Sequence, residues 1–207
     1  MGTDEHPNQN LIANNSLRQA VLIVALVNLT YFFVEFVVAQ KIGSVSLFAD
    51  SVDFLEDAAV NCLIALALGW SIKKRALVGM VMAGLLLVPA AALFWTAWQK
   101  LGNLTPPEPW LLSVTGLGAL VVNVSCAFLL TRFRHASGSL TQAAFLSARN
   151  DAFANIAIIG TGLVTLVWVS GWPDLIVGIV IATMNADAAK EVWFAAREEH
   201  SLTHDRT

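Results

Sequence analysis

Residues 44–57 read Ser-Val-Ser-Leu-Phe-Ala-Asp-Ser-Val-Asp-Phe-Leu-Glu-Asp, an apolar segment with four acids among its last eight residues. The 207-residue chain around it is 57% hydrophobic and only 13% charged, outside the range of soluble globular domains. A membrane is therefore the expected surrounding of this segment. Because a charge at the centre of a membrane helix costs at least about 2.5 kcal/mol, the acids are expected to face protein, water or a cation.

Hydropathy on both sides of this segment predicts six transmembrane helices, each with the roughly 20 apolar residues that a crossing needs. We expect them at 18–39, 46–70, 76–98, 110–131, 140–168 and 172–192. The predicted fold class is an all-α membrane protein. A polar, disordered tail is expected at 1–15, one transmembrane domain at 16–199, and a short tail at 200–207, which leaves no room for a separate soluble domain.

The basic residues predict how the chain lies in the membrane. Most of those between spans follow the second and the fourth predicted spans, which places both termini in the cytoplasm by the positive-inside rule. The polar N-terminus does not resemble a cleavable signal peptide. We expect a multi-pass protein of the bacterial inner (cell) membrane, with the lipid bilayer as a partner. The formal net charge of -3 gives no reason to expect nucleic acid as a partner.

One face of the second predicted span carries most of the acids. At 100° per residue, Ser46, Asp50, Asp53 and Asp57 fall within one narrow arc, and Glu56 flanks it. Because Asp53 and Asp57 are spaced i,i+4, their carboxylates point at one region, where protons or a cation must relieve the repulsion. A wetted face held by interhelical hydrogen bonds is the alternative, but four acids exceed what helix packing requires.

The fifth predicted span supplies a matching face. Asp151 is the only acid there, and it shares one side of the helix with Ser147 and Asn155. If the two faces meet, carboxylates from two helices offer oxygen ligands to a divalent metal ion, and neighbouring polar side chains complete a shell of four to six ligands. The candidate ligands are Asp53, Asp57, Asp151, Ser147 and Asn150. The candidate secondary or ion-path residues are Asp50, Glu56, Asn155 and Glu35.

Glu35 belongs to a polar face of the first predicted span, together with Asn28 and Tyr31. This face has two possible roles, and the sequence does not decide between them: it forms hydrogen bonds to neighbouring helices, or it lies on the ion path. Asn123 in the fourth span is expected to bond to a neighbouring helix. All four histidines lie outside the predicted spans, so no imidazole is expected at the membrane site.

The run at 44–57 resembles the second-helix signature of the cation diffusion facilitator family. In that family a His or Asp, three residues, then Asp supply half of a tetrahedral metal site, and Asp53 and Asp57 occupy these positions. The half from the fifth helix, usually His, three residues, then Asp, aligns with Ser147 and Asp151. The resemblance extends from Leu17 to about Glu199 and so covers almost all of the chain.

The resemblance implies a homodimeric antiporter that exports Zn²⁺ or a related divalent ion from the cytoplasm in exchange for protons, with no organic cofactor. Because Ser147 stands where the family often has a ligating His, the site is richer in oxygen. This oxygen-rich site favours Mn²⁺, Fe²⁺ and Co²⁺ as substrates more than a typical zinc site would, and Cd²⁺ is a further alternative. Most relatives continue into a cytoplasmic domain, so we expect a short form that dimerises through its membrane helices.

The sequence also bears on two function classes other than transport. An enzyme is not expected, because the sequence offers no nucleophile with a base partner and no His cluster at the membrane interface. A metal-binding membrane sensor or scaffold, which binds the ion without moving it, is the alternative to a transporter.

Overall fold

The computed structural model describes residues 6–67, 91–131 and 139–184, and these residues form helices joined by short turns, with no strand among them. The helical segments are α1 (His6–Ile42), α2 (Val45–Ala67), 91–102, α4 (Pro109–Thr131), α5 (Ser139–Val167) and Trp172–Met184. The prediction of an all-α membrane protein with six transmembrane helices is confirmed. Parts of the predicted third and sixth spans, at 76–90 and 185–192, lie outside the described residues, as does the predicted tail at 200–207.

Three of the described helices are long and apolar enough to cross a membrane by themselves: Asn15–Ile42 in α1, Pro109–Thr131 and Ala148–Val167. The helix α2 is also long enough to cross a membrane, but four of its residues are acids. Large apolar side chains such as those of Trp98, Trp110 and Phe128 are exposed. Such a surface suits lipid, whereas buried polar side chains such as those of Glu35, Asp50 and Asn155 lie between the helices.

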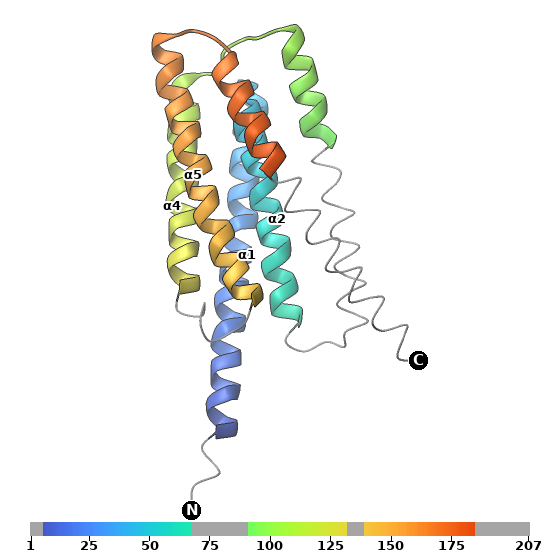
Figure 1. Ribbon diagram of the computed structural model, residues 1–207, viewed down its shortest axis with the longest axis vertical. Helices are drawn as coiled ribbons and strands as arrows, with labels where there is room; N and C mark the ends of the chain where they lie inside the picture. The colour runs from blue at the N-terminus through green and yellow to red at the C-terminus, as the bar shows by residue number, and fades with distance from the viewer. Residues whose placement is uncertain (1–5, 68–90, 132–138, 185–207) are drawn as a thin grey trace, which may run out of the picture.

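The helix α1 begins at His6, inside the segment that the sequence predicts as a disordered tail. Pro7 follows at a first-turn position, where a helix tolerates proline because no N–H is needed there. At the other end Gly43 adopts φ 64°, and the N–H of Ser44 donates to the carbonyl of Ala39 at 3.1 Å. This left-handed closing turn ends α1 and lets α2 return beside it (Figure 1).

Four helices form a closed ring. The helix α1 packs against α2 and α4, and α5 packs against the same two helices from the other side (Figure 1). The turns at 43–44, 103–108 and 168–171 lie at one end of this bundle, which we call the turn end. The N-terminal part of α1 extends beyond the opposite end of the bundle (Figure 1). The ring encloses a strip of polar side chains, with which the candidate site is built.

At the turn end, Asp174 ties three helical segments together. Its carboxylate accepts hydrogen bonds from the Ser44 and Ser46 hydroxyl groups at 2.6 and 2.7 Å and from the Val45 N–H at 2.9 Å. It also pairs with Nζ of Lys100 at 3.0 Å, and this nitrogen donates to the carbonyl of Gly43 as well. Asp174 thus satisfies free N–H groups at the start of α2 from a different helix. We call this network the Asp174 clamp.

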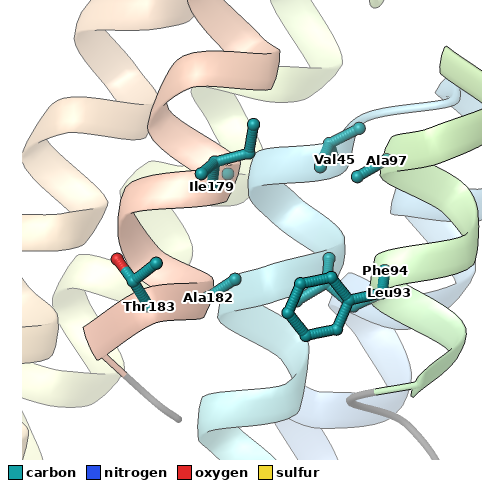
Figure 2. A pocket seen from close by; sticks show the side chains of 8 residues that line it. Val45, Leu93, Phe94, Ala97, Ile179, Ala182 and Thr183 are labelled. Atoms are coloured by element: carbon teal, nitrogen blue, oxygen red, sulfur yellow. The ribbon is translucent and has the colours of Figure 1, made fainter. Parts of the chain in front are cut away.

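Gly178 allows the last helix to reach α2. A Cβ atom at this position would lie 2.7 Å from Cγ1 and 2.8 Å from the carbonyl carbon of Val45, closer than side chains approach backbone. Beside this contact lies a small pocket, lined by Leu93 and Phe94 from one side and by Ile179 from the other (Figure 2). The pocket is apolar and contains none of the acids, so it is separate from the candidate metal site.

Candidate metal centre

Asp53 and Asp57 on α2 face Asp151 on α5. All three side chains are half-buried, which fits a site between helices that still admits an ion. Asp151 lies within hydrogen-bonding reach of Asp57 and interacts electrostatically with Asp53, and Glu56 is close enough to interact with both Asp53 and Asp151. The predicted meeting of the α2 and α5 faces is therefore present in the structure. Three carboxyl groups in one region concentrate negative charge that a divalent cation would neutralise.

Within the described ranges, no three His, Cys, Asp or Glu side chains are grouped tightly enough to hold a metal ion together. The three aspartates are neighbours in this conformation, but they do not yet form one coordination shell. Because they come from two helices, a small movement of α5 against α2 would change the spacing between the two halves. This geometry suits a site that is assembled and released as helices move.

Polar partners hold the Asp57 side of the site. Nδ2 of Asn28 on α1 donates to Oδ2 of Asp57 at 3.4 Å, and Nδ2 of Asn61 donates to the Asp57 carbonyl at 2.8 Å. The thiol of Cys126 on α4 lies 3.7 Å from Oδ1 of Asn28. The first-helix polar face thus contributes an interhelical bond that reaches a candidate ligand. A place on the ion path stays a prediction for this face.

A chain of polar side chains crosses the ring closer to the turn end. Asn123 on α4 donates to Oδ1 of Asn155 on α5 at 2.9 Å, and Nδ2 of Asn155 donates to Oδ2 of Asp50 on α2 at 2.6 Å. The Asp50 carboxyl group interacts with that of Glu35 on α1. Each helix of the ring therefore contributes one residue, and all four side chains are buried. The bonding role predicted for Asn123 is confirmed.

The other sequence-predicted positions have different surroundings wherever the structure describes their side chains. Asn155 uses both ends of its amide for Asn123 and Asp50, so it bridges helices and does not reach toward Asp151. Asn150 is exposed. Ser147 belongs to α5, but its side chain lies outside the described part of the structure. Ser46, although on the acidic arc of α2, bonds to Asp174 at the turn end.

Two buried charged residues, Asp174 and Lys100, are paired in a way that was not predicted from the sequence. Asp174 is completely buried and Lys100 is 7% exposed, and their ion pair is the one found among the described residues. A signal was present, because an acid directly after Pro173 opens an apolar helix and a lysine ends another helical segment. Their pairing could not be foreseen, because they are separated by 74 residues.

The sequence matches the cation efflux transmembrane domain over residues 21–195, which is most of the chain. The chain belongs to the cation efflux family. This membership confirms the resemblance found in residues 44–57, and it agrees with a bundle whose carboxylates lie between the second and fifth helices. No curated protein matches the sequence.

Proteins of the cation efflux family are membrane transporters and not enzymes, and divalent metal ions are their substrates. The buried acids of α2 therefore belong to a protein that moves cations across a membrane. In this cation efflux protein the metal is cargo, so the site must bind the ion and also let it go. Half-buried carboxylates on two separate helices meet both demands better than a rigid, closed shell.

Proposed function

We propose that this cation efflux protein exports a divalent metal ion from the cytoplasm in exchange for protons, with Asp53, Asp57 and Asp151 as the principal metal ligands. The observation that carries the proposal is the approach of Asp151 on α5 to both α2 aspartates. Carboxylates that bind a divalent cation also bind protons, and the two compete for the same oxygens. Protons taken up from the far side would then displace the metal ion.

Zn²⁺ is the proposed main substrate, with Cd²⁺, Co²⁺, Fe²⁺ and Mn²⁺ as alternatives. Zinc accepts carboxylate oxygens, but a site without imidazole loses much of its preference for zinc over harder ions. Ser147 and Asn150 are proposed as further ligands beside the aspartates. Ser147 is the stronger candidate ligand of the two, because it lies one helical turn before Asp151 on the same side of α5. Asn150 is exposed.

The topology in the membrane and the oligomeric state are proposed from the positions of the basic residues and from the apolar outer surface. Lys73, Lys74 and Arg75 after the second span, and Arg132 and Arg134 after the fourth, support cytoplasmic termini in a bacterial inner membrane. A homodimer formed through membrane helices is proposed because apolar side chains cover the described outer surface, on which a second copy can replace lipid.

Flux in proteoliposomes tests the function. Purified protein is reconstituted, a pH gradient is imposed, and the movement of Zn²⁺, Mn²⁺, Fe²⁺, Co²⁺ and Cd²⁺ is followed one metal at a time. We expect metal to move against the proton flow and to stop when the gradient is collapsed. Tight binding without movement of any metal would instead indicate the sensor or scaffold, and flux that is indifferent to the pH gradient would contradict proton exchange.

A further inference from the structure

Glu35 on α1 and Asp50 on α2 form a buried pair of carboxyl groups. Both side chains are 0% exposed, and they lie within hydrogen-bonding reach of each other. Oδ2 of Asp50 accepts the bond from Asn155 at 2.6 Å, but Oδ1 of Asp50 and both oxygens of Glu35 meet no N–H or O–H donor. Two ionised carboxylates would not be stable in this arrangement, because buried charges need partners.

The surroundings of the pair offer no positive charge within the described residues. The titratable groups that act on it are Tyr31 on α1, Asp53 and Asp57 on α2 and Asp151 on α5. The fourth helix of the ring contributes the uncharged Asn123, through Asn155. The ion pair of the described residues, between Lys100 and Asp174, involves neither Glu35 nor Asp50. A proton is the simplest positive charge that fits between the two carboxyl groups.

We propose that Glu35 and Asp50 form a proton-binding site, distinct from the candidate metal ligands, in which the carboxylic acid of Glu35 donates a hydrogen bond to Oδ1 of Asp50. This bond supplies a donor to the Asp50 oxygen that lacks one. It also leaves Asp50 ionised, which suits the hydrogen bond that its other oxygen accepts from Asn155. The pair then carries one negative charge in place of two.

The site is connected to metal binding through α2. Asp50 lies three residues before Asp53 on the same arc of the helix, and the two carboxyl groups interact electrostatically. A divalent ion bound at Asp53, Asp57 and Asp151 brings positive charge close to the pair and favours its fully ionised form. The O–H bond of Glu35 then breaks, its proton passes to solvent, and the hydrogen bond to Asp50 is lost with it. This step rests on the proposed function, and it adds one released proton per metal ion bound.

Proton counting tests the inference. Purified protein in a weak buffer is titrated with Zn²⁺, and the protons released per Zn²⁺ bound are measured for the wild type and for Glu35→Gln. A glutamine keeps the size of the side chain and can donate its amide N–H to Asp50, so the variant should fold and still bind Zn²⁺. We expect the release to fall by one proton per Zn²⁺. An unchanged release would overturn the proposal.

Two further measurements keep the test decisive. If Glu35→Gln does not fold, Glu35→Ala, which also removes the carboxyl group that carries the proton, replaces it with the same expected loss. Glu108→Gln, at an exposed acid of the turn end, should release as many protons as the wild type. The infrared carbonyl band of protonated carboxyl groups in the metal-free protein should weaken in Glu35→Gln. A band of unchanged intensity would overturn the proposal even if the wild type moves no metal, so the two proposals can fail separately.

Discussion

At the scale of single residues, Asp57 connects the candidate site to three helices, because it bonds to Asn28 on α1 and reaches Asp151 on α5. We expect Asp57→Ala to abolish metal flux and to weaken metal binding by at least about tenfold, since even residues that only support metal ligands contribute that much. Insertion and folding should persist, because a buried acid is costly to a membrane fold.

Flux in proteoliposomes and binding by calorimetry measure the effect of Asp57→Ala, and circular dichroism measures its helix content. Glu108→Gln is the matched control, since Glu108 caps the start of α4 through the Trp110 and Leu111 N–H groups and lies at the surface. Full flux in Asp57→Ala would remove this residue from the metal site.

We expect Ser147 to influence the metal preference of the proposed site. Replacing it with His adds a nitrogen ligand one helical turn before Asp151, so Ser147→His should shift transport toward Zn²⁺ relative to Mn²⁺. Competition between the two metals in the flux assay measures the shift. Asn150→His is the comparison, because Asn150 is exposed and its replacement should therefore shift the metal profile less than Ser147→His does. A larger shift in Asn150→His than in Ser147→His would show that Asn150, and not Ser147, is the further ligand.

At the scale of helices, the Asp174 clamp stabilises the start of α2. Removing one partner of a buried ion pair leaves the other charge unpaired, at a cost of about 3–5 kcal/mol. We therefore expect Asp174→Ala to lower the melting temperature in detergent clearly. The double variant Lys100→Met with Asp174→Asn should recover much of this loss, because it removes both charges and keeps an acceptor for the α2 N–H groups. Equal stability of the wild type and Asp174→Ala would show that the clamp contributes little.

Close packing of the last helix on α2 gives a second prediction at this scale. Gly178→Ala introduces a methyl group 2.8 Å from backbone, so it should destabilise the protein by about 1–3 kcal/mol. Gly160→Ala is the matched control, because nothing lies within 4 Å of the added atom and alanine is favoured by up to about 1 kcal/mol in a helix. Denaturation followed by circular dichroism compares the two. Similar losses in both variants would contradict the packing argument.

How far the sequence predicts these features depends on their range. The acidic arc of α2 and its counterpart with Asp151 were predictable, because helical periodicity relates residues three and four apart. The Asp174 clamp was not predictable, since its partners are distant along the chain. Each residue taken alone is also an ordinary sight in a sequence, as an acid near the start of a helix or a lysine near the end of one. The bond from Asn155 to Asp50 was missed for the same reason, because periodicity shows which face a residue occupies but not the depth at which two helices meet.

At the scale of the whole molecule, the proposed topology places the turn end outside the cell. Asn103→Cys, at an exposed position between 91–102 and α4, should react with a membrane-impermeant maleimide added to intact cells. His135→Cys, which follows the basic residues after the fourth span, should react only after the membrane is permeabilised. The reverse labelling pattern would invert the topology and the direction of transport.

The Asp174 clamp also bears on how the protein is made. A membrane protein emerges from the ribosome from its first residue to its last, and the Val45 N–H that Asp174 satisfies lies 129 residues upstream. The Ser44 hydroxyl caps the Leu47 N–H locally at 3.1 Å, but the Val45 and Ser46 N–H groups gain their acceptor only when the last described helix has been synthesised and inserted. Until then α2 carries its acids in the bilayer with an unfinished end, so its final docking is a late event in biogenesis.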